Sequence, residues 1–196
     1  MATRRKHPVY RVTDLLTIQP DDELDAALKA AINENLSDQE KSVLQVVTTI
    51  VPSCYNSEHE RVALVEFRDG VPSFLAELRS NPLGDWQIEM GDTDISFDCH
   101  FFGFTQLYKP RLEGQVTAEY VAFPYASSLP IFNLFLANSS RYSIIAITGL
   151  DGHAYGSWRG KGNLGRMWLR DFLSKDLPNC RTMTYGYTTL SCRLMG

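Results

Sequence analysis

Four side chains of the kinds that bind metal ions lie close together near the middle of the chain: Asp92, Asp94, Asp98 and His100. A calcium-binding loop starting at Asp92 would need glycine at its sixth position and glutamate at its twelfth. Those positions hold Phe97 and Gly103. We therefore interpret the segment as a turn followed by a solvent-facing strand, and we expect neither a metal ion nor a cofactor.

Two glycine-rich segments late in the chain have spacings that resemble those of active-site loops. Residues 152–156 (GHAYG) have the glycine spacing of the G-x-S-x-G nucleophile elbow, but Ala154 stands where that motif needs serine. Residues 160–165 (GKGNLG) lack the residue order of a phosphate-binding loop and are typical of a surface loop. We expect His153 to hold the local backbone rather than to contact a substrate.

The composition suits a folded protein of one or two domains. The chain has 196 residues, 44% of them hydrophobic and 21% charged, and a net charge of −4, which argues against a nucleic-acid binder. The four cysteines include no C-x-x-C pair, so we expect reduced thiols. No stretch approaches the ~20 apolar residues that cross a bilayer. We expect an intracellular, cytoplasmic protein.

Periodicity in the first half of the chain predicts alternating strands and helices. Strand formers fill residues 9–18, and Pro20 begins a helix with apolar residues at helical spacing. Ser37 and Glu40 have the pattern of a capping box. The remaining elements are predicted as strands over residues 43–51 and 62–67, a helix from Pro72, and a strand over residues 86–90. This order is that of the split βαβ, or ferredoxin-like, arrangement.

Three regions follow from this pattern. Residues 1–108 are predicted to form the ferredoxin-like βαββαβ domain, with residues 92–108 as an aromatic-rich appendage. Residues 109–141 contain several prolines and many apolar side chains, and we interpret them as an irregular linker or insertion. Residues 142–196 restart with a strand, a glycine-rich loop, a helix and a strand, which is the pattern of one βαβ unit in a parallel sheet. Trp158 and Trp168 are expected to anchor the core of that unit. The fold class is therefore α/β, with an α+β N-terminal domain.

The last region resembles the start of the lipase-like serine esterases, which are α/β hydrolases. It is most similar to the domains found at the N-terminal ends of large fungal proteins that continue into nucleotide-binding and repeat regions. The resemblance covers residues 142–188, in the blocks 144–153 (IIAITGLDGH), 156–158 (GSW), 167–173 (MWLRDFL), 177–181 (LPNCR) and 185–187 (YGY).

This resemblance implies an oxyanion loop at Gly149, Leu150 and Asp151, directly after the first strand of the region. Thr148 stands where the family usually has histidine. The chain contains no G-x-S-x-G motif and therefore none of the family's catalytic residues. We expect a truncated relative without hydrolase activity by itself, which would act on an ester only if missing residues completed the domain. The stretch 119–143 is additional to the family pattern.

The ferredoxin-like order also resembles an RNA-recognition fold, which leaves a binding or scaffold role as the alternative function. Such folds stack bases on exposed aromatic side chains of the sheet. The corresponding positions here are Arg11, Val62 and Leu64, none of them aromatic. We therefore expect a protein partner rather than RNA.

Overall fold

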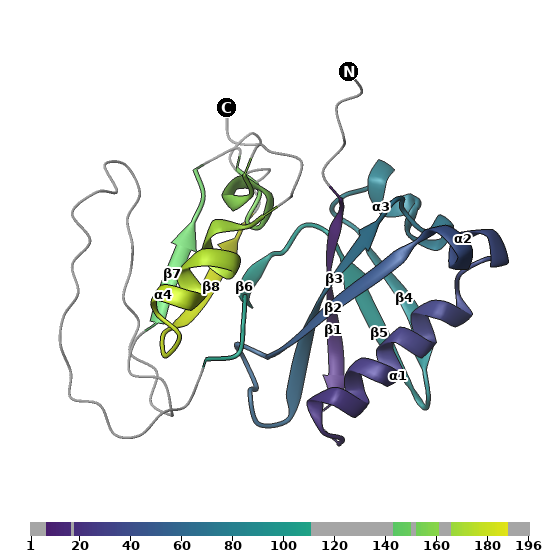
Figure 1. Cartoon of the computed structure of the whole chain (residues 1–196), viewed down its shortest axis with the longest axis horizontal. Helices are drawn as coiled ribbons and strands as arrows, with labels where there is room; N and C mark the ends of the chain where they lie inside the picture. The colour runs from purple at the N-terminus through teal and green to yellow at the C-terminus, as the bar shows by residue number, and fades with distance from the viewer. Residues whose placement is uncertain (1–6, 17, 111–142, 150–151, 161–165, 188–196) are drawn as a thin grey trace, which may run out of the picture. The chain divides into compact units, whose positions relative to one another are not determined.

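The structure, a computed structural model, describes residues 7–16, 18–110, 143–149, 152–160 and 166–187 (Figure 1). The described residues form a mixed α/β structure with two β-sheets. The described residues divide into a first unit up to His100 and a second unit from Phe101 onward. The predicted linker, residues 109–141, lies outside the described residues except for its first two positions.

The first unit is built on a five-stranded antiparallel sheet of order β2-β3-β1-β5-β4. Its strands are β1 (Val9–Leu16), β2 (Gln45–Pro52), β3 (Glu60–Arg68), β4 (Asp85–Met90) and β5 (Thr93–Asp98). Its helical elements are α1 (Asp21–Glu34), α2 (Asp38–Val43), a 3-10 turn (Ser73–Leu75) and the single-turn α3 (Glu77–Ser80). The four strands predicted in this region and the helix after Pro20 are confirmed, whereas the helix after Pro72 is short.

One side of this sheet and one face of α1 form the core. Tyr10 and Phe67, from β1 and β3, belong to the same buried cluster as Leu28 and Ile32 of α1. Figure 1 shows α1 lying across the sheet. Strand residues alternate between the two faces and helix residues recur every three to four positions, so each element buries one side. Burial of each large apolar side chain contributes about 1.5–3 kcal/mol.

A β-bulge in β1 keeps its second half in register with this core. Val12 pairs with Ala63 and Leu15 pairs with Arg61, so two residues of β1 face one residue of β3. Strict alternation after Val12 would turn Asp14 toward the core. The bulge exposes Asp14, which takes a left-handed φ of 66°, and returns the fully buried Leu15 to the core.

The order of the strands differs from the predicted one. β5, predicted to belong to an appendage, pairs with β1, whereas β4 lies at the edge and pairs with β5. Ile95 and Phe97 of β5 are fully buried, whereas every second residue of β4 is exposed and only Ile88 is buried. An interior strand buries more apolar surface than an edge strand, so β5 is the better interior strand. Gly91, with φ of +63°, makes the turn between the two strands.

The second unit contains a three-stranded sheet of order β6-β8-β7. The strands are β6 (Gly103–Gln106), β7 (Ser143–Ile147) and β8 (Arg181–Gly186). β7 and β8 are parallel, and β6 is antiparallel to β8. The connection from β7 to β8 includes a 3-10 turn, η2 (Gly156–Trp158), a π-helical turn, η3 (Leu169–Leu173), and the short α4 (Ser174–Asp176). The predicted βαβ unit with parallel strands is therefore confirmed. The sequence pattern assigns β6 to the first domain, but Phe104 packs on Tyr185 of β8 at a ring distance of 4.8 Å.

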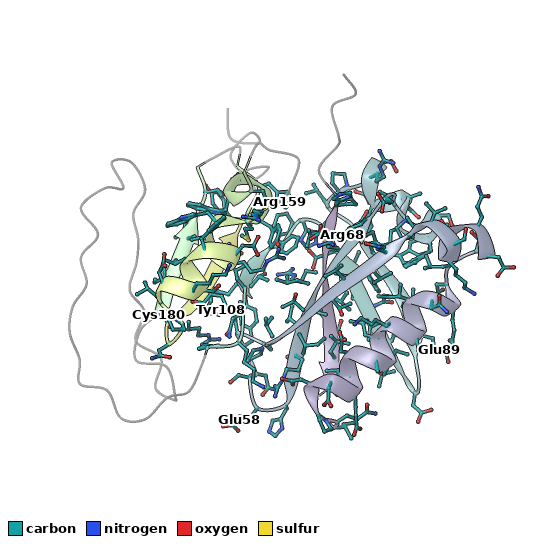
Figure 2. The ribbon with its side chains drawn as sticks, in the orientation of Figure 1. Glu58, Arg68, Glu89, Tyr108, Arg159 and Cys180 are labelled. Atoms are coloured by element: carbon teal, nitrogen blue, oxygen red, sulfur yellow. The ribbon has the colours of Figure 1, made fainter. Side chains whose placement is uncertain are left out.

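Tyr108 fastens the residues after β6 to the turn before β8 (Figure 2). Its hydroxyl oxygen lies 2.8 Å from the carbonyl oxygen of Cys180, 3.1 Å from that of Leu177 and 3.0 Å from Thr182 Oγ1. A phenol can donate one such bond and accept another, so the three groups share its hydroxyl. Burial raises the pKa of Tyr108 above its usual value, which keeps the hydroxyl protonated.

Replacing Tyr108 with phenylalanine removes these bonds and leaves the ring in place. We expect Tyr108→Phe to lower the free energy of unfolding by about 1–2 kcal/mol, because partly buried carbonyls lose their donor. Thermal unfolding followed by circular dichroism measures the loss. Tyr55→Phe is the matched control, since Tyr55 is 71% exposed. Equal melting temperatures for the two variants would contradict the assigned role.

The Glu40 carboxylate joins two turns of the first unit. It accepts hydrogen bonds from the backbone N–H of Ser37 at 2.9 Å and from that of Ser73 at 2.6 Å. The predicted capping box with Ser37 is therefore confirmed, while the bond from Ser73 was not anticipated. These bonds, led by that from the Ser37 backbone, lower the pKa of Glu40 from 4.5 to about 2.

This lowered pKa predicts a pH-dependent contribution to stability. The Glu40 carboxylate stabilises the fold above pH 4.5, and this contribution is lost as the pH falls from 4.5 to about 2. We expect Glu40→Gln to unfold at lower urea concentration than the parent protein at neutral pH, with a difference that shrinks across this range. Glu89→Gln is the control, because it removes the same charge from an exposed side chain. A pH-independent difference for Glu40→Gln would argue against the assigned bonds.

Candidate functional site

The carboxyl ends of the parallel strands β7 and β8 define the candidate site of the second unit. Thr148 and Gly149 follow β7, and Tyr187 follows β8. Ligands of parallel α/β sheets bind at this edge. Of the three predicted oxyanion-loop residues, Gly149 is described and exposed, whereas Leu150 and Asp151 lie outside the described residues.

Thr148 holds the turn that begins this loop. Its hydroxyl donates to the carbonyl oxygen of Gly152 at 3.2 Å, and the Gly152 N–H donates to the Gly149 carbonyl oxygen at 2.9 Å. The Tyr187 hydroxyl donates to the Thr148 carbonyl oxygen at 2.9 Å. A Cβ on Gly152 would lie 2.6 Å from Thr148 Cβ, so this position requires glycine. Thr148 therefore holds the backbone at Gly152 through its hydroxyl.

His153 caps the 3-10 turn that follows. Its Nδ1 accepts hydrogen bonds from the backbone N–H groups of Tyr155 at 3.1 Å and Gly156 at 2.9 Å. An unprotonated Nδ1 is required, so any ring proton is on Nε2. The expectation that His153 holds the local backbone is confirmed. Its ring also contacts the Phe101 ring edge-on, at a centroid distance of 5.8 Å.

Phe101 supports the loop through a strained backbone. It is fully buried, its φ of 56° is left-handed, and its ring stacks on that of Tyr155 at 5.0 Å. Such a conformation costs a bulky residue about 1–3 kcal/mol and needs surrounding contacts to hold it. Gly186 supplies one of them, because a Cβ there would lie 1.9 Å from the Phe101 carbonyl oxygen. Sequence reasoning missed this pair, although glycine near a strand end can signal close backbone approach.

Arg170 and Asp171 anchor the loop to the helical segment. Arg170 Nη1 donates to the Tyr155 hydroxyl at 2.8 Å, and Arg170 Nε donates to Asp171 Oδ1 at 2.7 Å. Asp171 Oδ2 accepts from the Met167 N–H at 2.7 Å. Burial acts to raise the pKa of Asp171, but the hydrogen bonds from Arg170 and Met167 outweigh it and lower that pKa.

The two tryptophans predicted as core anchors differ in their environment. Trp158 is partly buried, but Trp168 is 54% exposed, so the prediction is wrong for Trp168. Leu169 and Leu173 are the buried residues of this segment, and Phe172 is exposed with Trp168. The buried pair Leu169 and Leu173 and the exposed pair Trp168 and Phe172 are each four residues apart, so Trp168 lies on a stripe of the helical segment beside the buried one.

A second group of ionisable side chains lies in the first unit. Asp98 Oδ1 lies 3.3 Å from His100 Nδ1, and Asp85 Oδ1 lies 3.2 Å from His100 Nε2. Asp98 also forms a 2.7 Å ion pair with Arg11. The expected solvent-facing strand is wrong for Asp98, which is 3% exposed. Asp92 and Asp94 lie apart from this group, in the turn and on an exposed strand position. Asp85 was not singled out, because the signal is its cross-strand register rather than its sequence spacing.

The face of the sheet opposite α1 carries the positions considered for RNA. Arg11 and Leu64 are opposed neighbours in β1 and β3, and Val62 lies two residues from Leu64 on the same face. Leu64 is 2% exposed, and Arg11 is held by Asp98. These positions offer no aromatic ring for base stacking.

Comparison with known proteins identifies no relative: no family model matches the chain, and neither does any curated protein or solved structure. None of the helices in the described part of the chain has the length and apolar character needed to cross a bilayer. Among the described residues, Cys54, Cys99 and Cys180 form no disulfide with one another.

The cap formed by His153 can be tested by removal and rescue. We expect His153→Ala to lower the free energy of unfolding by about 1 kcal/mol, because two backbone N–H groups lose their acceptor. His153→Asn should restore most of the loss, since the asparagine side-chain oxygen accepts the same bonds. Urea unfolding measures both variants. Equal destabilisation by Ala and Asn would assign the effect to the ring contact with Phe101 instead.

Proposed function

We propose that the second unit is the opening segment of a serine-esterase-like α/β hydrolase. The observation that carries this proposal is the parallel β7–loop–helix–β8 unit, in which the loop held by Thr148 and His153 lies after β7. The antiparallel β6 beside this pair is compatible with a larger mixed sheet, such as those of many α/β enzymes.

In this proposal the loop after β7 binds the oxyanion that forms when an ester carbonyl is attacked. Backbone N–H groups of Gly149, Leu150 and Asp151 would donate to that oxygen. Apart from its neighbours along the chain, no atom of the described residues lies within 4 Å of where a Cβ on Gly149 would be, which leaves room on that side for a carbonyl group. Thr148 takes part by shaping the backbone, since its hydroxyl is bonded to the Gly152 carbonyl oxygen.

The chain does not supply the nucleophile of this chemistry. Its 196 residues include no G-x-S-x-G motif. Ala154, at the matching position of the GHAYG segment, is 3% exposed, and its Cβ lies 3.1 Å from where a Cβ on Gly186 would be. A residue packed in this way has no access to substrate. We therefore propose a hydrolase relative without turnover of its own.

For the first unit we propose a ferredoxin-like fold and, as the second candidate function, a protein-binding role. The neighbours β2, β3, β1 and β5, with α1 between β1 and β2, have the strand order of that fold, and β4 is then an added edge strand. The three positions that would stack bases, Arg11, Val62 and Leu64, carry no aromatic side chain, which favours a protein rather than RNA as the binding partner. We also propose a cytoplasmic location, which the spacing of the four cysteines, without a C-x-x-C pair, supports.

Serine reactivity tests the proposed lack of turnover. We expect the purified chain not to react covalently with a fluorophosphonate probe. We also expect it to hydrolyse 4-nitrophenyl butyrate no faster than the same chain does after it has been unfolded in urea and diluted into assay buffer at a temperature at which it does not refold. A Ser-containing lipase is the positive control. Stoichiometric labelling of one serine, lost when that serine is replaced by alanine, would overturn this part of the proposal.

The proposed origin from a hydrolase is tested by the genomic sequence. If the proposal is correct, the reading frame that follows the codon for Gly196 in the gene, or in a related locus, encodes a G-x-S-x-G motif and then an acidic residue and a histidine. A frame without these residues in that order would remove the support for a hydrolase.

A further inference from the structure

Two carboxylates face each other across neighbouring strands of the first unit. Asp85 of β4 and Asp98 of β5 occupy directly opposed positions in the antiparallel pair. Like charges at such positions destabilise a sheet, and the penalty is larger here because Asp98 is 3% exposed. The pair therefore requires positive charge close by.

Arg11 supplies that charge to one side of Asp98. Arg11 lies opposite Asp98 in the β1–β5 pair, and its Nε donates to Asp98 Oδ2 at 2.7 Å. The second oxygen of the same carboxylate, Oδ1, faces His100 Nδ1 at 3.3 Å. Asp98 is thus compensated by Arg11 and is placed to orient the imidazole ring.

The imidazole of His100 connects the buried carboxylate to the exposed one. A neutral imidazole has one N–H and one lone pair. When the proton is on Nδ1, facing Asp98, the Nε2 lone pair faces Asp85 Oδ1 at 3.2 Å. In this tautomer the two electron-rich atoms repel each other unless a metal ion joins them, whereas in the other tautomer Nε2–H donates to the Asp85 carboxylate.

These atoms have the spacing and the supporting partners of a metal site. Ligands bound to one zinc-like ion at about 2.0–2.2 Å lie roughly 3–3.5 Å apart. The potential ligand atoms of Asp85, Asp98 and His100 all lie within 4.8 Å of one another. Histidine ligands commonly donate their second ring N–H to a carboxylate that is itself hydrogen-bonded, as Asp98 is by Arg11.

We propose that His100 Nε2 and the Asp85 carboxylate bind a divalent transition-metal ion of the zinc, cobalt or manganese type. Asp98 is the positioning residue that orients His100, and water fills the remaining positions because the Asp85 side chain is 59% exposed. Calcium fits less well, since it takes oxygen ligands and not imidazole nitrogen. This site departs from the expectation of no metal, and it does not depend on the hydrolase proposal.

Cobalt(II) titration of the full chain, followed by visible absorption at neutral pH, tests this site. We expect one Co²⁺ per chain, with weak d–d bands and no thiolate charge-transfer band. The neighbouring Cys99 thiol donates instead toward the carbonyl oxygens of Leu78 and Pro82. Asp85→Asn and His100→Gln should each weaken binding at least tenfold. Asp94→Asn and His59→Gln, exposed changes of the same types, should leave it unchanged.

Asp98→Asn separates a positioning role from a ligand role. We expect it to weaken Co²⁺ binding at least tenfold while the d–d spectrum at saturation stays that of the parent protein, since the ligands are unchanged. Circular dichroism confirms that each variant is folded, and Asp85→Asn, on an exposed edge position, keeps the test valid if the buried variants unfold. Unchanged binding in Asp85→Asn, a thiolate band, or no saturable binding would overturn the proposal and leave His100 as an imidazolium between two carboxylates.

Discussion

The buried ion pair between Arg11 and Asp98 joins the central strand β1 to β5 in the first sheet. A buried charge without a partner costs several kcal/mol, whereas a paired one is tolerated. Arg11 is 8% exposed and lies on the central strand β1. If β4 lay beside β1, as the sequence pattern predicts, Arg11 would lose the opposed carboxylate of β5. The observed order satisfies both charges and also places the apolar residues of β5 inside the sheet.

This order has a consequence for the edge of the sheet. With β5 beside β1, the hairpin places Asp85 opposite Asp98, on the far side from Arg11. One arginine cannot compensate two carboxylates on opposite sides of a strand. His100 therefore lies where a second positive group is required, and the proposed metal ion meets the same requirement more fully than a neutral imidazole does.

The sequence predicts where the strands and helices lie along the chain better than it predicts which strands are neighbours in a sheet. Alternation and helical spacing depend on which side of an element is buried, so β1, α1, β2, β3 and the parallel β7–β8 unit follow from the residues alone. Strand order depends on pairings between distant residues, such as Arg11 with Asp98, which periodicity does not encode. The same reason hides the pairing of β6 with β8. The prediction for Trp168 is wrong because it rests on the size of the side chain, which does not indicate the side of the helical segment on which it lies.

The candidate loop of the second unit could be predicted in position but not in its means of support. Strand, glycine-rich loop and helix occur in that order in the sequence, whereas the contacts that fix the loop come from residues with no catalytic signature. Phe101 adopts a costly backbone conformation beneath Tyr155, and Gly186 leaves room for it. Strain of this kind persists only where surrounding contacts maintain it. Thr148 and His153 use their polar atoms on backbone groups of Gly152, Tyr155 and Gly156, so the chain's own contacts hold this part of the segment.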